Sequence, residues 1–481
     1  MKRRTFLASG AAIASGALTT GLSSKIALAL DLDSVPITAN ELAIAARPET
    51  IAARQKIFGV DNVDPDTGLL PRFRVIISWI TNASFALAIA RRVVYCDTHV
   101  TRLEITPGRT PFVIKDLVDA APTAILLGHG HFDHAENAAY LAAKTGATLY
   151  ASEESCAAMR SDFARMSSDP LIQNDPVARF PAGATLNLVP VTSTGSTPGT
   201  QIVRLNFLEP FAQVIAFRHL HSVATPPDPA YSRNVFYPTD GRIAVDARDA
   251  GLWPPGTALY PANNQPPQPG QLNLRTAGNP GAAVAIFYAI TLRTGSNFSF
   301  AWNNTIGALR EGKGSAWTNG VPADGQRIVN ILKQLAPVNV YSAAVGTANA
   351  VNNGLRDLID YQSALKPVIF VPNHQTTGGA DVGETKSPVH QAIYLEQLRV
   401  MGIPKSEWPD VRWNFDRADY LKPMVFDAQL PDKRTNALRQ AQIRNFDQYP
   451  YAENIVATLS SPATAALAVS DEAADAGECE E

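Results

Sequence analysis

Between residues 73 and 96, apolar residues form three short runs that are separated by turns. The runs are rich in valine, isoleucine and aromatic residues and span residues 73–79, 84–89 and 93–96. Such residues are enriched in strands, and short connections favour antiparallel neighbours. The pattern therefore predicts a meander of three antiparallel strands. The third run leads into Asp97-Thr98-His99, which places polar side chains at the end of a strand.

Downstream of the meander, helical patterns alternate with short apolar runs. The runs expected to form strands span residues 124–127, 147–151, 185–189, 212–217, 282–292, 298–302, 338–344 and 367–371. The segments expected to form helices span residues 114–120, 137–144, 152–166, 324–335, 354–365 and 434–446. Apolar runs of this length are typical of buried strands, and the alternation indicates a fold that mixes helices with sheets.

The first 29 residues have the pattern of an export signal. Lys2, Arg3 and Arg4 precede Phe6 and a mildly apolar stretch, and residues 27–29 offer a cleavage site of small residues. Paired arginines in this setting resemble a twin-arginine signal, which carries folded proteins across a membrane. We therefore expect a periplasmic or otherwise exported protein without a stable membrane anchor after cleavage.

Three further segments are set apart from the central strands. Residues 30–70 are predicted to form a helical N-terminal extension. Residues 223–280 are dense in proline, asparagine, aspartate and glycine, and a connection of this length is typical of a lid or a binding insertion. Residues 426–481 are predicted to form a C-terminal helix followed by an acidic, disordered tail.

Composition and charge narrow the classes of partner. The chain has 481 residues, of which 46% are hydrophobic, and a formal net charge of -3. It can therefore bury a large core, and it shows no basic excess of the kind that a nucleic-acid partner requires. Its three cysteines are too few and too scattered for a disulfide framework or a thiolate metal site. We expect a small-molecule substrate, and the sequence does not define the oligomeric state.

The strongest chemical signal follows the predicted strand at 124–127. His129, His131, Asp133 and His134 lie within six positions, although the whole chain has only 8 histidines. Imidazole nitrogen and carboxylate oxygen are suitable ligands for zinc and related divalent metals. Open α/β folds place their ligands in loops at the carboxyl ends of strands. The motif therefore predicts a metal site.

This motif, His129-x-His131-x-Asp133-His134 after an apolar strand, resembles the signature of the metallo-β-lactamase superfamily. The resemblance covers roughly residues 71–425. It implies an α+β fold, in which two mixed β-sheets lie between two layers of helices as a four-layer αββα sandwich. It also implies that His129 and His131 bind a first metal ion together with a later histidine. Asp133, His134 and a last histidine would bind a second ion.

Two residues compete for the place of the later histidine. His219 and His221 both follow the predicted strand at 212–217, and on an extended chain they would point to the same side. We favour His221, because the His-Ser pair that it begins resembles the branch related to lactonases and phosphodiesterases. His374 fits the last histidine of the family pattern, because it follows a buried strand and opens a turn.

One position departs from the family pattern. The family has an aspartate that bridges both metals between the third and the last histidine, but Asn304 takes its place here. A neutral amide is a poorer ligand and does not balance the charge of two cations. Three outcomes stay open: the second ion binds weakly, another carboxylate such as Asp240 substitutes, or catalysis has been lost. For Asp240, a turn residue before a glycine is the simpler interpretation.

The resemblance implies a metal-dependent hydrolase that acts on an ester, a lactone or a phosphodiester-type small molecule. One or two ions, with zinc first among the divalent metals, would activate a water molecule for attack. Asp133 would position that water and take up its proton, and Asp97 would orient a ligand histidine. His99 could join the site, although a loop histidine without a metal role is the simpler interpretation.

Other functional classes fit less well. A nuclease of the same superfamily would carry a basic surface, which the net charge of -3 does not suggest. A di-iron oxidoreductase of this fold usually has a glutamate in the place of His131. The strongest alternative is a non-catalytic or single-metal binding protein of the same fold, with a degraded second metal site at Asn304.

Overall fold

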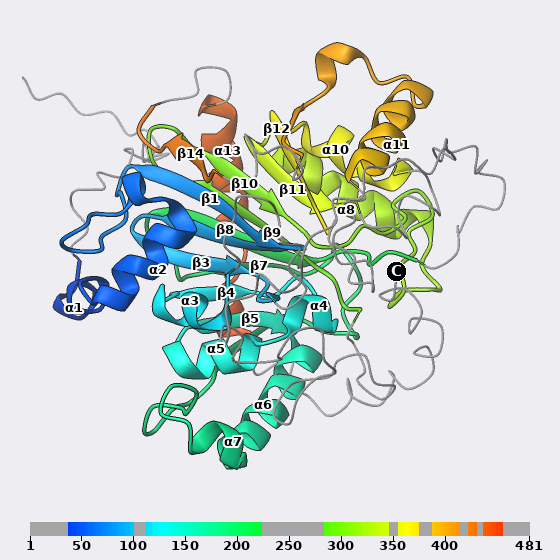
Figure 1. The fold of residues 1–481 in the computed structure, drawn as a ribbon. Coiled ribbons are helices and arrows are strands. Elements are labelled where there is room, and N and C mark those ends of the chain that lie inside the picture. Colours follow the sequence, from blue (N-terminus) through cyan, green and yellow to red (C-terminus); the bar gives the residue numbers. More distant parts are fainter. Residues whose placement is uncertain are drawn as a thin grey trace, which may run out of the picture.

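The structure, a computed structural model, describes residues 37–100, 112–223, 283–345, 355–374, 387–413, 422–430 and 436–455. Within these ranges, two mixed β-sheets of seven strands each pack face to face between two layers of helices (Figure 1). This is the four-layer αββα sandwich that the resemblance implied, and the predicted α+β fold is confirmed. The predicted signal at 1–29, nearly all of the insertion at 223–280 and the tail beyond residue 455 lie outside the described residues.

The first sheet begins with the predicted meander. Its strands are β1 (Arg74–Thr81), β2 (Ser84–Ile89), β3 (Arg92–Cys96), β4 (Ala124–Leu126), β5 (Thr148–Ser152), β6 (Asn187–Thr192) and β14 (Met424–Asp427). Their order is β14-β1-β2-β3-β4-β5-β6. Strands β1, β2 and β3 pair antiparallel, whereas β3 to β6 pair parallel. The carboxyl ends of β3 and β4 therefore meet at one edge of the sheet.

The second sheet repeats this mixed pairing. Its strands are β7 (Ile202–Leu205), β8 (Ala212–Arg218), β9 (Ile286–Leu292), β10 (Ser299–Trp302), β11 (Val340–Ala344), β12 (Ile369–Asn373) and β13 (Asp410–Val411). Their order is β13-β12-β11-β10-β9-β8-β7. Strands β7 to β10 pair antiparallel and β10 to β13 pair parallel. Strands β8, β10 and β12 consequently run in the same direction and end at one edge.

The core has three apolar layers, because neighbouring residues on each strand point to opposite faces. On β8, Val214 and Ala216 pack between the two sheets, whereas Ile215 and Phe217 pack against the outer helices. A strand that is buried on both faces reads as a continuous apolar run in the sequence. This is why the apolar runs located the strands so well.

Helices cover the outer face of each sheet (Figure 1). Those on the first sheet are α1 (Ala39–Ala45), α2 (Pro48–Phe58), α3 (Ile114–Asp119), α5 (Ala138–Thr145), α6 (Glu153–Ser168) and α7 (Pro170–Gln173), with the 3-10 turn η2 (Val60–Asn62) after α2. Those on the second sheet are α8 (Pro322–Leu335), α10 (Arg356–Leu365), α11 (Ser387–Val400) and α13 (Asn436–Phe446), with the turns η4 (Lys405–Glu407) and η5 (Ala452–Asn454). A short helix, α4 (Phe132–Ala135), carries part of the metal motif. No helix in the described ranges combines the length and the apolar character that a membrane crossing needs.

Segments on the far side of two predicted domain boundaries, at residues 70 and 425, pack with the sandwich. In the predicted extension at 30–70, Ile57 and Phe58 of α2 belong to the core over the first sheet. Past the predicted boundary at residue 425, β14 pairs with β1 and extends the first sheet. The sequence missed β14 because this edge strand has only four residues, which alternate between half-buried and exposed and so form no apolar run.

Candidate metal centre

The metal motif lies where strand ends from both sheets meet. The loop after β4 and the short helix α4 bring His129, His131, Asp133 and His134 to this edge. His221 arrives three residues after β8, and His374 directly follows β12. Because these strands end at the same edge of their sheets, residues distant in the sequence converge on one place.

The first group of ligands consists of His129, His131 and His221. All three side chains are buried, and one ring nitrogen from each lies within 4.8 Å of the others. Nε2 of His129 is 3.0 Å from Nδ1 of His131. This group joins two histidines from the loop after β4 with one histidine from the second sheet.

An amide fixes the orientation of His129. The Nδ2 atom of Asn304 donates to Oδ2 of Asp97 over 2.8 Å, so its Oδ1 atom faces Nδ1 of His129 at 2.7 Å. An amide oxygen only accepts, and the hydrogen-bond network therefore assigns the proton of His129 to Nδ1. The lone pair on Nε2 of His129 is left facing the other two histidines. His221 is arranged alike, with Nδ1 at 2.9 Å from the carbonyl oxygen of Ser222.

The second group consists of Asp133, His134 and His374. Its ligand atoms also lie within 4.8 Å of one another. Oδ2 of Asp133 is 3.0 Å from Nε2 of His374 and 3.3 Å from Nε2 of His134. His134 in turn directs Nδ1 to Oδ2 of Asp97 at 2.8 Å. Asp97 therefore orients one histidine of the second group directly and His129 of the first group through Asn304.

Two buried acceptors in the second group test whether a cation fits. Since His134 gives its Nδ1 proton to Asp97, Nε2 carries a lone pair that faces the Asp133 carboxylate. Nε2 of His134 has no hydrogen-bond partner and lies 3.3 Å from Oδ2 of Asp133, and the other carboxylate oxygen, Oδ1, also has no partner. Buried polar atoms are normally paired, and two facing acceptors repel unless a cation lies between them. Imidazoles together with a carboxylate are the donor set that binds zinc and similar ions, so the residues fit a divalent metal.

The charge states of these residues follow from burial and from their neighbours. Burial, reinforced by the nearby His134, His131 and His221, lowers the pKa of His129 well below its usual value and keeps the ring neutral. For Asp133, burial alone would raise the pKa. The surrounding His134 and His374 outweigh burial and hold the pKa of Asp133 well below its ordinary value, so the carboxylate is ionised at neutral pH.

One glycine permits this packing. A Cβ atom on Gly128 would lie 2.4 Å from the side-chain atoms of Asn304, which is closer than any non-bonded carbon contact allows. The backbone N–H of Gly128 donates to Oδ1 of Asp97 over 3.0 Å. The residue before the motif must therefore lack a side chain, because Asn304 occupies the space beside it.

Asn82 is a site residue that sequence reasoning missed. It lies at the turn between β1 and β2, and its Nδ2 atom donates to Oδ2 of Asp133 over 3.1 Å and to the carbonyl oxygen of Asp133 over 3.0 Å. Its φ angle of 49° is one that asparagine tolerates better than most residues. The available signal was an asparagine in a tight turn between two predicted strands.

The structure separates the competing sequence predictions. His221 joins the first group, whereas His219 points away and places Nδ1 at 3.1 Å from the hydroxyl of Tyr361. The expectation that both point to the same side was wrong, because the chain leaves strand geometry after Arg218. His99 pairs with Glu136 at 2.8 Å instead of joining either group.

Asn304 lies elsewhere than predicted. Instead of bridging the two groups, its amide lies behind His129, and both of its polar atoms are used by His129 and Asp97. An amide suits this place because it offers one donor and one acceptor. Asp97 orients ligand histidines as expected. The other candidate for the bridge, Asp240, lies outside the described residues.

No protein-family model matches the chain, and no curated protein matches it. Among solved structures, it is similar to a metallo hydrolase from the hyperthermophilic archaeon Ignicoccus hospitalis, at 10% identity over 74% of this chain and 99% of that chain, with a TM-score of 0.37. An isothiocyanate hydrolase from Delia radicum gut bacteria shows 14% identity over 73% of this chain and 100% of that chain, with a TM-score of 0.37. CmlA, a diiron β-hydroxylase from Streptomyces venezuelae, shows 11% identity over 74% of this chain but only 54% of its own length, with a TM-score of 0.36. These likenesses are distant, so the function proposed below rests on the site itself.

Proposed function

We propose that this protein is a metal-dependent hydrolase that attacks a small-molecule substrate with an activated water molecule. The observation that carries the proposal is the convergence of two groups of metal-ligating atoms at one edge of the sandwich, one of them built around an ionised carboxylate. His129, His131 and His221 would hold one ion, and Asp133, His134 and His374 would hold another. Zinc is the first candidate, because imidazole nitrogens dominate both groups.

A bound divalent ion supplies a Lewis acid that polarises the bond under attack and makes water more acidic at neutral pH. The chain's own residues provide the rest of the chemistry. Asp133 is ionised and buried, and it can orient the attacking water and accept its proton. Asn82 holds Asp133 in place by donating one hydrogen bond to its carboxylate and one to its backbone carbonyl oxygen. Asp97 and Asn304 fix the rings of His134 and His129, which leaves Nε2 of each ring turned towards the site.

The substrate that we propose is an ester, a lactone or a phosphodiester-type small molecule. The class follows from the resemblance of the His-Ser pair at His221 to lactonases and phosphodiesterases. The formal net charge of -3 favours a small substrate over a nucleic acid. Export through the twin-arginine route stays a prediction that depends on Arg3 and Arg4.

A second candidate function is a protein of this fold that binds one metal ion and does not catalyse hydrolysis. The position of Asn304 favours it, because its amide is engaged behind His129 and provides no bridging charge. Two divalent ions would then face only one carboxylate ligand among the described groups, that of Asp133. Metal stoichiometry and turnover distinguish the two candidates.

The test is metal analysis of the purified protein together with turnover of a generic ester, lactone and phosphodiester. We expect bound divalent metal, loss of turnover after chelation and recovery when zinc, manganese or iron is returned. His221→Ala should lose metal and turnover. His219→Gln, two residues away and turned towards Tyr361, is the matched control and should keep both. One bound ion without turnover would support the binding protein, whereas a metal-free protein would contradict both candidates.

A further inference from the structure

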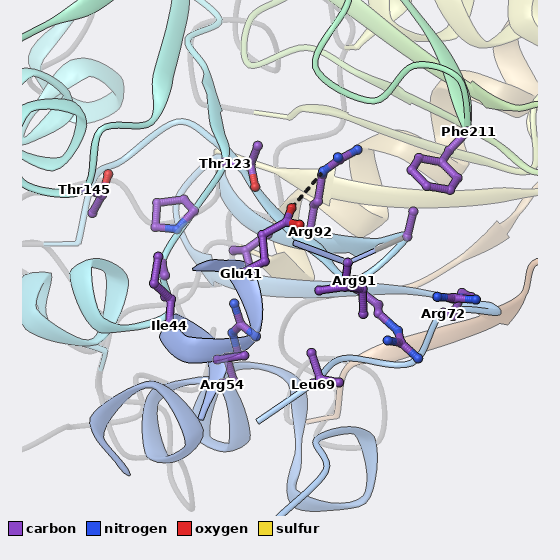
Figure 2. Close-up of a pocket in the computed structure, with 16 residues that line it drawn as sticks. Glu41, Ile44, Arg54, Leu69, Arg72, Arg91, Arg92, Thr123, Thr145 and Phe211 are labelled. Carbon is purple, nitrogen blue, oxygen red and sulfur yellow. Dashed lines mark ion pairs between the residues drawn. The ribbon is translucent and has the colours of Figure 1, made fainter. Parts of the chain in front are cut away.

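A cavity of about 160 Å³ lies at the opposite end of the first sheet from the metal centre. It is bounded by α1, α2, the turn between β2 and β3, and the start of β4 (Figure 2). Strand β3 begins at this cavity with Arg92 and leads to Asp97 at the metal centre. Five residues of strand separate the two by roughly 15 Å. The cavity is therefore distinct from the candidate metal centre.

The charged residues of the cavity wall are mostly arginines. Arg54, Arg72, Arg91 and Arg92 line it, and Glu41 is the one carboxylate among the described lining residues. Glu41 already accepts hydrogen bonds from Thr38, and it lies 3.9 Å from Nε of Arg92. Among the described lining residues, four arginines therefore share the cavity wall with one carboxylate.

Arg54 is the buried member of this set. Its side chain is 6% exposed, with Nε donating to the carbonyl oxygen of Ala120 over 3.1 Å and Nη1 to that of Gly68 over 2.8 Å. These carbonyls hold the guanidinium rigidly but carry no charge, and no carboxylate in the described part of the chain forms an ion pair with it. Burial lowers the pKa of Arg54 to about 10, which still leaves it charged at neutral pH. Buried charges are normally paired, so a guanidinium held in this way favours an anionic ligand.

Apart from Thr123 and Thr145, the remaining wall is mostly apolar. Ile44, Leu69, Val93 and Phe211 surround the arginine side chains, and Figure 2 shows Ile44 and Phe211 on different sides of the cavity. Ligand pockets commonly combine such apolar walls with a few fixed polar groups. A cavity of about 150 Å³ accommodates a molecule of the size of benzene. The occupant should therefore have a small apolar body and one anionic group.

We propose that this cavity is a second ligand site, which binds a small organic anion of about the size of benzoate or phenyl phosphate. The guanidinium of Arg54 binds the carboxylate or phosphate group, because its planar donors match the oxygen atoms of either. Arg91 and Arg72 add positive charge at the half-buried side of the cavity. The apolar side chains bind the ring or chain to which the anion is attached.

Isothermal titration calorimetry on the full-length, chelator-treated protein tests this proposal without competition from bound metal. Benzoate and phenyl phosphate are the probes, and the uncharged benzamide and inorganic phosphate are the controls. We expect at least one of the two aromatic anions to bind at least tenfold more tightly than benzamide and inorganic phosphate. The stronger of the two identifies whether the site prefers a carboxylate or a phosphate.

Variants locate the binding. Arg54→Met should weaken binding of the preferred anion at least tenfold, whereas Glu41→Gln should tighten it by removing the competing carboxylate. Arg160 is an exposed arginine on α6, and Arg160→Ala is the matched control. This variant should leave the affinity for the anion unchanged. If Arg54→Met fails to fold, Arg91→Ala at the half-buried side of the cavity gives the same readout. Equal binding of benzamide, or unchanged affinity in both arginine variants, would overturn the proposal.

Discussion

The two ligand groups of the metal centre differ in charge and in access to solvent. The first contains three histidines that are each 6% exposed or less, and no carboxylate. The second contains the ionised carboxylate of Asp133, and the side chain of His374 is 21% exposed. The first group thus suits an ion that has a structural role and does not itself contact the reacting substrate. The second group has both the negative charge and the opening that a reacting substrate requires.

The groups are nevertheless joined through one residue. Asp97 accepts from His134 in the second group and from Asn304, which in turn accepts from His129 in the first. A single buried carboxylate thus orients ligands of two groups that have different chemical roles.

The largest effect is expected from Asp133→Asn. This change removes the only carboxylate among the six described ligands and the proposed acceptor of the proton. We expect kcat/KM to fall by about 10²- to 10⁴-fold, which is the usual contribution of a general acid or base. Metal analysis should show the second ion lost and the first retained. Asp162→Asn, a buried carboxylate on α6, is the control and should change neither quantity. Loss of both ions in Asp133→Asn would mean that the two groups behave as one site.

Mild acid should affect the metal-free protein through the first group before the second. The folded-state pKa of His129 lies well below the usual value of 6.5, so only the unfolded chain takes up this proton below pH 6.5. The stability that this group contributes is present above the unfolded-state pKa of about 6.5 and is lost progressively as the pH falls below that value. Burial likewise lowers the pKa of His219, to about 3, which adds a loss in the same pH range.

Asp133 also loses its contribution on acidification, but only at a lower pH. Its folded-state pKa is depressed below the usual value of 3.8, so its contribution to stability is present above that pH and is lost only as the pH falls towards the folded-state value. Urea unfolding in a chelator between pH 7.5 and 5 measures the difference. His129→Asn should flatten the loss of stability, whereas Asp133→Asn should not flatten it. The reverse result would assign the acid sensitivity to the second group.

The smallest effect is expected from Asn304→Asp. The new carboxylate would face Oδ2 of Asp97, where the amide now donates a hydrogen bond. We expect the metal-free protein to lose about 1–3 kcal/mol, the cost of an unsatisfied buried polar group. Added zinc should recover more thermal stability in this variant than in the original protein, because the extra charge favours a cation nearby.

Asn303→Asp provides a matched control for that change. Asn303 is also buried, but its amide bonds to the carbonyl oxygen of Thr305 and to Tyr341 instead of to Asp97. This variant should also be destabilised, and zinc should not rescue it preferentially. Equal rescue of both variants would show that residue 304 does not influence the metal groups.

Much of the fold could be predicted from the sequence, because the strands at the centre of each sheet are buried on both faces. The runs that became β8 and β9 are continuous and apolar, and so they stood out. The edge strands β13 and β14 could not be found in this way. Strand β13 has two residues and β14 has four, and their pairing depends on neighbours that are distant in the sequence.

Part of the candidate ligand set could also be predicted, because some of its members lie close together in the sequence. His129, His131, Asp133 and His134 are close in the sequence, so their spacing was visible. The roles of Asn304 and Asn82 depend on contacts across 175 and 51 positions of the chain. An amide reveals neither its partner nor its orientation in the sequence. The placement of Asn304 behind His129 therefore required the three-dimensional structure.

Each ligand group draws two residues from the first sheet and one from the second. An ion in either group would therefore act as an internal cross-link between the two halves of the sandwich, much as a disulfide joins two segments of a small secreted protein. Because the ligands come together only in the folded protein, the free energy of metal binding would add to the cohesion between the sheets. Metal supply would then govern how long the folded chain survives as well as how fast it reacts.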